Sequence, residues 1–307
     1  MSEFEIRDPR MGGLVLAYAQ LDHLWTGGRW LEGPAYLAAG RYLVFSDIPN
    51  DRMMRYDETN GMVSVFRGPS DNSNGNTVDQ EGRLVTCEHR TRRVTRTEPD
   101  GSVVSLASHY EGRRLNSPND VVVKSDGSLW FSDPTYGIDT DYEGDAAPSE
   151  LGRQCVYRLD PRTGALAAVA TDRVQPNGLA FSPDETTLYV SDTGASHVAD
   201  HPRSLTAYDV LPDDSLANPR TFAVLEEGFF DGLRCDVFGN VWTSAFRSAR
   251  CYAPDGTHLG TLPMPERVSN LCFGGRKRNR LFITAHTSLY AIYVNTRGAI
   301  RPPARRP

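Results

Sequence analysis

The sequence predicts an all-β protein folded as a six-bladed β-propeller, with four antiparallel strands per blade and the ring closed by an N-terminal strand. Short apolar runs alternate with Gly, Asp, Pro and Asn, and helical periodicity is scarce. One strand–turn–strand phrase recurs six times. The copies begin 39 to 58 residues apart, close to the roughly 40 to 50 residues of a propeller blade.

Each copy begins on a polar residue, continues through an apolar strand and a turn, and ends in a second strand that often finishes in Ser-Asp. The third copy reads NDVVVKSDGSLWFSD from Asn119, and the fourth reads NGLAFSPDETTLYVSD from Asn177. A second hairpin follows, as in YRLDPRTG and LAAVAT, so each unit supplies the four strands of a blade. The six first residues are Glu32, Asn74, Asn119, Asn177, Asp231 and Asn270.

The two ends of the chain suggest how the ring closes. After SLYAIYV the sixth copy runs into NTRGAIRPPARRP, which is not strand-like, whereas DHLWTGG lies just before Glu32, where a fourth strand belongs. We expect one domain over 1–307, in which 14–30 supply the closing strand and lead into the blades at 31–295. Residues 296–307 are expected to form a disordered tail. A pair of β-sandwiches is the alternative, but it would not require a repeat in fixed phase.

Composition excludes several classes of function. The formal net charge of -6 does not favour nucleic-acid binding, and no apolar run is long enough to span a membrane. The start MSEFEIRDPR lacks the pattern of a signal peptide, so a cytoplasmic location is expected, or a periplasmic one if a signal has been removed. The five cysteines form no CxxC pair and are expected to be buried, reduced thiols. The oligomeric state is left open.

The six first residues are the candidate site. In a propeller the first strand of each blade lines the central channel, so equivalent positions meet at one mouth. Asn and Asp are also ordinary turn formers, but Glu32 is a poor turn residue. Two carboxylates and several amides suit one hard divalent cation: Ca²⁺ first, then Mg²⁺ or Mn²⁺. Zn²⁺ is a weaker match, because no sulfur or imidazole stands among them.

Further candidates lie near the same mouth. Asn74 and Asn270 are expected to contact substrate, as is His286, which ends the second strand of the last blade. Residues 133–154 are an insertion that explains the longest spacing. This acidic, aromatic segment is a candidate lid from which Tyr136 would contact a sugar ring; the alternative is an exposed loop without a role.

Four motifs in order, LEGPAYL, SPNDVVVKSDGSLWFSDPTYG, PNGLAFSPDETTLYVSD and DGLRCDVFGNVW, resemble the gluconolactonase, senescence marker protein (regucalcin) and luciferin-regenerating enzyme family, and bacterial gluconolactonases above all. The likeness runs from about Leu31 to Val294. It implies a six-bladed propeller with one divalent metal in the channel. The implied metal ligands are Glu32, Asn119, Asn177 and Asp231.

The resemblance also implies an activity, the hydrolysis of a sugar lactone, with D-glucono-1,5-lactone opened to gluconate. The cation would polarise the carbonyl while water attacks, with Asp231 as the base and Asp120, often a substrate contact in the family, as the second choice. Ser117 is also expected to contact substrate, but it stands where many animal members carry Arg, which puts the sugar contacts in question. The alternatives are an ester or organophosphate hydrolase and a calcium- or ligand-binding propeller without turnover.

Overall fold

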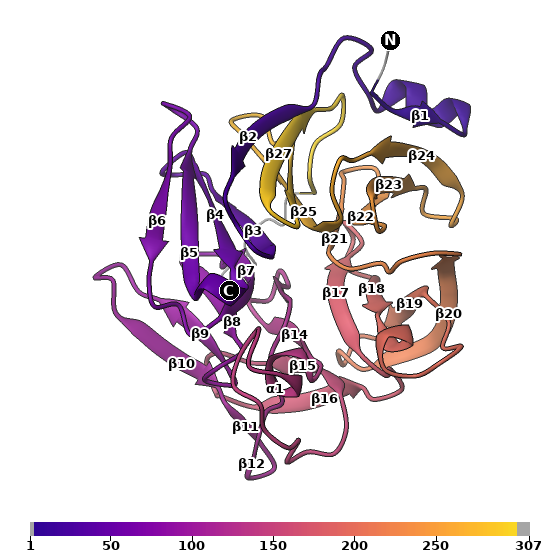
Figure 1. Cartoon of the computed structure of the whole chain (residues 1–307). Coiled ribbons are helices and arrows are strands. Elements are labelled where there is room, and N and C mark those ends of the chain that lie inside the picture. Colours follow the sequence, from indigo (N-terminus) through magenta and orange to yellow (C-terminus); the bar gives the residue numbers. More distant parts are fainter. Residues whose placement is uncertain (1–2, 300–307) are drawn as a thin grey trace.

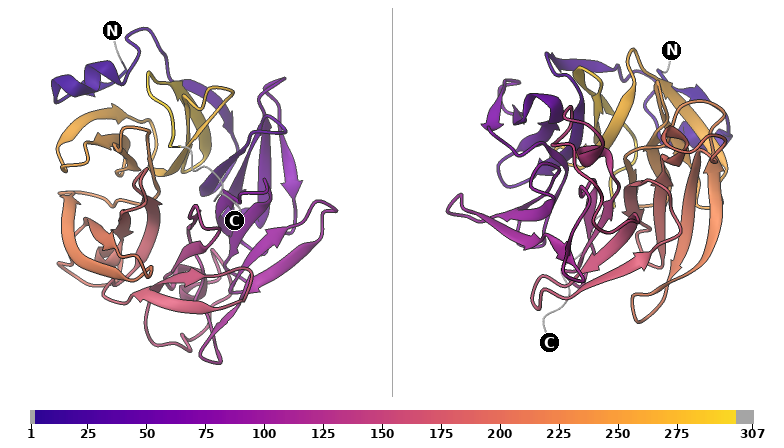
Figure 2. Two further views of the ribbon diagram at one scale, coloured as in Figure 1. Left: turned by 180° about the vertical axis from the view of Figure 1, so that it is seen from behind. Right: turned by 60° about the horizontal axis from the view of Figure 1, so that its bottom comes forward.

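The computed structural model describes residues 3–299 and confirms the predicted fold class. Six antiparallel sheets, five of four strands and one of five, are arranged as blades around a central channel (Figure 1). Viewed from behind and from below, the ring stays closed and each blade packs against its two neighbours (Figure 2). The first strands of adjacent blades contact one another around the ring, so these strands form the channel wall.

Blade one consists of β3 (Leu31–Leu37), β4 (Tyr42–Asp47), β5 (Arg52–Asp57) and β6 (Val63–Arg67), with the 3-10 helix η2 (Ile48–Asn50) after β4. Blade two consists of β7 (Ser73–Val78), β8 (Leu84–Glu88), β9 (Arg93–Thr97) and β10 (Val103–Ala107), followed by the small hairpin of β11 (His109–Tyr110) and β12 (Arg113–Arg114). Blade three consists of β13 (Val121–Val123), β14 (Leu129–Asp133), β15 (Cys155–Leu159) and β16 (Leu166–Ala170), with the helix α1 (Tyr136–Asp139) in the insertion.

Blade four consists of β17 (Pro176–Phe181), β18 (Thr187–Asp192), β19 (Ser204–Val210) and β20 (Leu216–Val224), with η3 (Gly194–Ser196) after β18. Blade five consists of β21 (Leu233–Cys235), β22 (Val241–Ser244), β23 (Ser248–Tyr252) and β24 (His258–Pro263). Blade six contains β25 (Val268–Gly274), β26 (Arg280–Ala285) and β27 (Ser288–Tyr293).

The fourth strand of blade six comes from the N-terminal segment. Strand β2 (Asp22–Thr26) pairs antiparallel with β27, with Asp22 opposite Ala291 and Thr26 opposite Ser288. The segment also adds β1 (Glu5–Ile6) as a fifth strand on blade five, beside β24, and the 3-10 helix η1 (Pro9–Gly13) follows. This fifth strand was not predicted from the sequence. The N-terminal segment thus joins two blades as well as closing the ring.

The blades are held together by apolar side chains on both faces of each sheet. Trp130 of blade three is fully buried and meets Phe181 of blade four edge to face, with ring centroids 5.1 Å apart. Trp242 and Phe273 make the same kind of contact between blades five and six, at 6.0 Å. Because a blade buries both faces, its strands read as short continuous apolar runs.

The end of the described chain corrects one prediction. Residues 296–299 are ordered against blade five: the Thr296 hydroxyl donates to Asp236 at 3.1 Å, and the Ala299 amide donates to the Cys235 carbonyl at 3.0 Å. Backbone pairing therefore extends past residue 295. The rest of the predicted tail, 300–307, lies outside the described residues.

All five cysteines, which lie within 3–299, are buried and unbonded to one another. Within that range the structure has no helix long and apolar enough to cross a membrane.

Candidate active site

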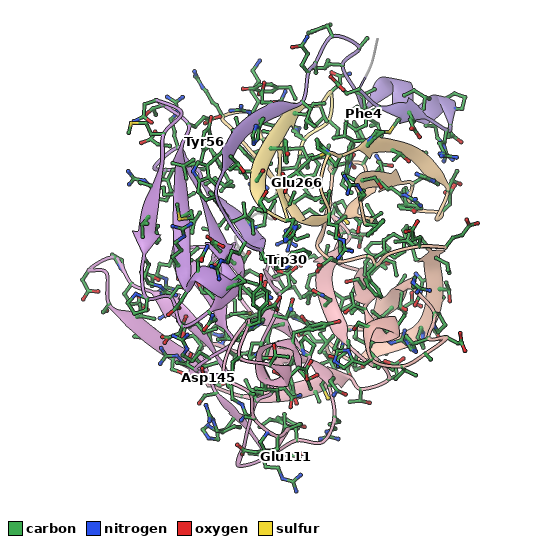
Figure 3. All side chains as sticks on the ribbon, in the orientation of Figure 1. Phe4, Trp30, Tyr56, Glu111, Asp145 and Glu266 are labelled. Atoms are coloured by element: carbon green, nitrogen blue, oxygen red, sulfur yellow. The ribbon has the colours of Figure 1, made fainter. Side chains whose placement is uncertain are left out.

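Five of the six predicted first residues meet in one cavity of about 280 Å³ at the mouth of the channel. Its lining includes Glu32, Asn74, Asn119, Asn177 and Asp231. Trp30 also lines it and lies near the centre of the ring (Figure 3). The structure therefore brings together all four residues that the family resemblance implies as metal ligands.

The serine of the repeated Ser-Asp ending helps to position these residues. The Ser46 hydroxyl at the end of β4 donates to the Asn74 carbonyl of the next blade at 2.7 Å. In the same way the Ser191 hydroxyl at the end of β18 donates to the Asp231 carbonyl at 2.8 Å. The second strand of one blade thus fixes the start of the first strand in the next.

Glycine directly after four of the first residues allows the first strands to approach closely. A Cβ atom on any of these glycines would lie 2.0 to 2.3 Å from an atom of the first residue in the next blade, which leaves no room for a side chain. They are Gly33, Gly75, Gly178 and Gly232. The register also shifts just here, between Glu32 and Ala35 and between Pro176 and Leu179, as at many sites where a bulge redirects a side chain.

Glu32 is almost fully buried, and one of its oxygens is held by the protein. Its Oε2 accepts hydrogen bonds from the Gly33 amide at 2.7 Å and from the Asn270 side-chain amide at 2.9 Å. Burial raises the pKa of Glu32, and the negative charges of Asp120 and Glu143 add to that effect. Asn270, expected to contact substrate, instead lies behind the cavity lining and orients Glu32.

Asp231 lines the same cavity as Glu32 and is partly exposed. Burial raises the pKa of Asp231 well above its ordinary value, as does the charge of Glu32, while a hydrogen bond from Asn177 opposes the shift. Two carboxylates that repel each other in a poorly solvated site favour either a shared proton or a cation between them.

Asn74 reaches the inserted segment through a histidine. Its Nδ2 lies 3.1 Å from His89 Nε2, and His89 Nδ1 lies 3.0 Å from the Glu143 carbonyl oxygen. Burial lowers the pKa of His89 to about 4, so the ring is neutral, accepting at Nε2 and donating at Nδ1. Asn74 Oδ1 is buried and has no hydrogen-bond partner in the described part of the chain.

The 133–154 insertion lies over the cavity and supplies two lining residues, Tyr136 and Glu143. The Tyr136 hydroxyl is 2.6 Å from the Thr193 hydroxyl and 2.8 Å from that of Ser196, both on the loop after β18. Burial and the charge of Asp139 raise the pKa of Glu143 to about 7. The segment is thus anchored to blade four and forms one side of the site.

Ser117 supports this segment and does not face the cavity. It is fully buried; its hydroxyl donates to the Pro134 carbonyl at 2.7 Å and accepts from the Gly137 amide at 2.9 Å. Its hydrogen-bonding capacity is used by the loop, so the expectation that it contacts substrate is corrected.

Asp120 and His286 are also placed differently from the expectation. Asp120 is buried behind the cavity lining, where its carboxylate accepts from the Val121 amide at 2.8 Å and pairs with Arg234 at 3.3 Å. An acid held in this way is unsuited to take a proton from water. His286 is exposed and packs beside Trp30, with ring centroids 5.6 Å apart, so it lies outside the lining.

Several lining residues were missed because they stand outside the repeated phrase. Loops before the first strands contribute Trp30, Phe229 and Arg267, and loops after the second strands contribute Thr193, Ser196 and Phe246. The Arg267 guanidinium lies over the Phe246 ring, 5.3 Å from its centroid. The signal in the sequence is positional: both kinds of loop meet at the mouth where the first residues gather.

The sequence also matches a known protein family. Residues 30–287 match the family described as the SMP-30/gluconolactonase/LRE-like region. The chain belongs to this family. A gluconolactonase from Zymomonas mobilis is 31% identical over 309 aligned residues, covering 94% of this chain and 85% of the relative.

Two other family comparisons agree. The solved structure of a gluconolactonase from Xanthomonas campestris superimposes with a TM-score of 0.88 at 38% identity, covering 95% of this chain and 94% of the other. A pentonolactonase from Haloferax volcanii is 28% identical, covering 84% of this chain and 82% of the relative. The relatives thus include proteins named for lactones of different sugars.

Proposed function

We propose that this protein hydrolyses a sugar lactone, with D-glucono-1,5-lactone as the first candidate and gluconate as the product. The observation that carries the proposal is the convergence of Glu32, Asn119, Asn177 and Asp231 in one cavity. Its family membership and the lactonases among its relatives support this assignment. The open cavity and the neighbouring hydroxyl groups suit a small polar substrate.

The donor set fits one divalent cation, Ca²⁺ first and Mg²⁺, Mn²⁺ or Zn²⁺ as alternatives. Glu32 and Asp231 are buried acids whose pKa values are raised by desolvation and by other nearby acids. Asn119 and Asn177 add amide oxygens, which hard cations accept as ligands. The described residues contain no group of three or more His, Cys, Asp or Glu able to hold a metal, so amides would have to complete the coordination. When bound, the cation would supply Lewis-acid stabilisation of charge on the lactone carbonyl oxygen.

The chain's own residues supply the rest of the chemistry. Asp231 is the proposed base that takes a proton from the attacking water. Glu143 is the second candidate, replacing Asp120, because it lines the cavity and its carboxylate has no hydrogen bond or ion pair to any residue in 3–299. Trp30 and Phe229 add aromatic rings to the cavity lining. Tyr136 also lines the cavity, and its ring is the proposed contact for the sugar, since its hydroxyl is hydrogen-bonded to Thr193 and Ser196.

The test is lactone hydrolysis followed by pH-stat, before and after removal of metal with a chelator. We expect activity to be lost on chelation and restored by adding back one or more divalent ions. Activity that survives complete metal removal would contradict the metal dependence. Metal binding without hydrolysis of gluconolactone or a pentonolactone would favour the binding-only alternative. Hydrolysis of simple esters or organophosphates faster than lactones would favour the alternative of an ester or organophosphate hydrolase.

We also propose a cytoplasmic location, supported by five buried cysteines with free thiols.

A further inference from the structure

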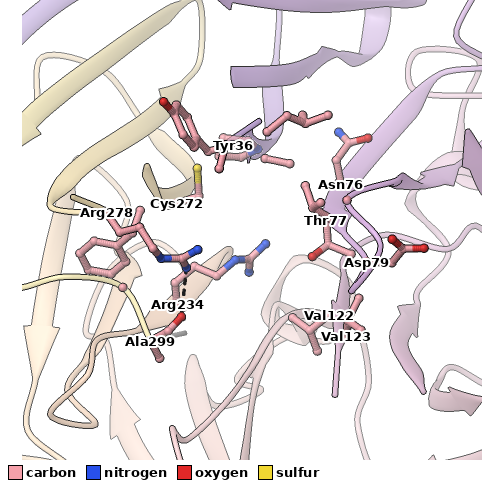
Figure 4. Close-up of a pocket in the computed structure, with 18 of the residues that line it drawn as sticks. Tyr36, Asn76, Thr77, Asp79, Val122, Val123, Arg234, Cys272, Arg278 and Ala299 are labelled. Carbon is pink, nitrogen blue, oxygen red and sulfur yellow. Dashed lines mark hydrogen bonds between the residues drawn. The ribbon is translucent and has the colours of Figure 1, made fainter. Parts of the chain in front are cut away.

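A second, larger cavity of about 640 Å³ lies further along the same first strands. Each first strand contributes residues that follow its site residue: Tyr36 after Glu32, Asn76 after Asn74, Val122 after Asn119, and Arg234 after Asp231. Figure 4 shows Tyr36, Cys272, Arg234 and Arg278 on one side, with Asn76 and Val122 across from them. Because it begins a few residues further along each strand, this far cavity lies toward the opposite end of the channel.

Arg234 directs part of its guanidinium into the far cavity (Figure 4). Its Nη1 donates to the Leu233 carbonyl at 2.6 Å and is 3.3 Å from Asp120 Oδ2, its acid partner. Within residues 3–299 the hydrogen bonds of this side chain all use Nη1. The remaining N–H groups of the fork are therefore available to a ligand.

Arg278 is a second cation on the same cavity. Its Nη2 donates to the Ala299 carbonyl at 3.0 Å, its Nε is buried without a partner, and no carboxylate within residues 3–299 pairs with it. The Cys272 thiol interacts electrostatically with both guanidinium groups. Burial nevertheless raises the pKa of that thiol to about 12, so it is neutral and supplies no counter-charge.

The other charged residues of the lining already have partners. Asp79 pairs with Arg83 at 2.8 Å, and Lys124 pairs with Asp214 at 2.5 Å. Asp120 offsets one of the two arginines. Among the described residues the far cavity therefore holds one uncompensated positive charge in partly desolvated surroundings, where an anion is strongly favoured.

We propose that the far cavity binds a small oxyanion, a carboxylate or phosphate group, between Arg234 and Arg278. A guanidinium offers paired N–H donors that match the oxygens of either group, and the cavity has room for a small molecule around the anion. The proposed anion site is separate from the candidate active site at the mouth of the channel. It does not depend on the function proposed for that active site. The shared chemistry fits two sources: a sugar acid such as the lactonase product, or a phosphate.

The test is calorimetric titration of the full-length, metal-loaded protein with inorganic phosphate and, separately, with D-gluconate at constant ionic strength. We expect saturable binding of at least one anion, weakened tenfold or more by Arg278→Met. The matched control is Arg276→Met: Arg276 is an exposed arginine of the same turn, outside the cavity lining, and its loss should leave affinity unchanged. Preference for gluconate or for phosphate identifies the source.

Three results would overturn the proposal: no saturable binding of either anion, unchanged affinity in Arg278→Met, or equal weakening in both variants. If Arg278→Met does not fold, Arg278→Lys keeps the charge but loses the paired donors, and it should still bind several-fold more weakly. Lactone hydrolysis by Arg278→Met should match the wild type, so the two proposals can fail independently.

Discussion

The two ends of the first strands offer opposite chemistry on one scaffold. At the channel mouth, Glu32 and Asp231 line one cavity, and Arg267 is the one cation among the described residues of its lining. At the far cavity, Arg234 pairs with Asp120, and Arg278 has no acid partner among the described residues. The same six first strands line both cavities. The repeat therefore determines the channel wall, while single residues along each strand determine the charge of each cavity. The comparison shows that the two linings have opposite charge: the acidic channel mouth suits a cation, and the basic far cavity suits an anion.

The Asp120–Arg234 pair lies where these two regions meet. Asp120 follows Asn119, which lines the channel mouth, and Arg234 lines the far cavity. The acid adds negative potential at Glu32 and Asp231, and the arginine offsets it. An ion pair at this position lies between the acidic lining of the channel mouth and the basic lining of the far cavity.

The largest expected effect is on activity, from a substitution in the candidate active site at the channel mouth. Asp231→Asn keeps the size of the side chain but removes a charge and the proposed base, so kcat/KM for gluconolactone should fall by about 10²–10³-fold or more. The melting temperature should not fall, because a buried acid that repels Glu32 is lost. Asn74→Ala is the control and should cost only a few-fold, since the Asn74 amide contacts His89. Turnover within tenfold of wild type would refute the role of Asp231.

Asp133, a further acid at the same end, has no ion pair to any residue in 3–299 and should make stability depend on pH. Asp133 is fully buried, accepts from the Asn116 amide at 2.9 Å, and has its pKa raised by burial to about 7. Since the folded state holds this proton more tightly than the unfolded chain, stability is fully present below about pH 4. It is lost as pH rises through about 7.

Asp133→Asn mimics the protonated acid, so its stability relative to the wild type should increase between pH 4 and pH 8 by up to about 4 kcal/mol. Urea denaturation at both pH values measures this difference. Asp47 ends β4 as Asp133 ends β14, but it pairs with Arg52 at 2.8 Å. Asp47→Asn should therefore destabilise at both pH values. A pH-independent difference between Asp133→Asn and the wild type would show that Asp133 is not a buried, unpaired acid.

The smallest effect is expected from the residue that orients Glu32. Asn270→Ala removes the 2.9 Å bond to Oε2, and loss of such an outer partner typically weakens metal binding about 10–100-fold. A Ca²⁺ titration should show this loss, with activity recovering at high metal concentration. Asn218 donates to the Asp209 carboxylate at 2.8 Å on an exposed hairpin, so Asn218→Ala is the matched control. Equal metal affinity in both variants would leave Asn270 without this role.

The sequence was enough to predict the ring and the residues that begin its first strands, because every blade needs the same residues to join its neighbour. Ser46 and Ser191 hold the next blade, and glycines such as Gly178 let the strands meet. The roles of Ser117 and Asp120 could not be read in this way, because they depend on the loop carbonyl and the arginine that the fold brings beside them.

Glu143 was missed for a different reason. It stands in the one long insertion, outside the phase of the repeat, and its position over the cavity depends on contacts such as that of Tyr136 with Thr193. Those contacts join segments that share no sequence pattern.

The pairing of β2 with β27 has a consequence for biosynthesis. Strand β2 is synthesised well before β27, by roughly 10 to 60 s at ordinary elongation rates. During that time the earlier blades can form while β2 stays an unpaired edge. The nascent chain must therefore keep this strand from wrong partners until β27 has been made, and the ring can close only then.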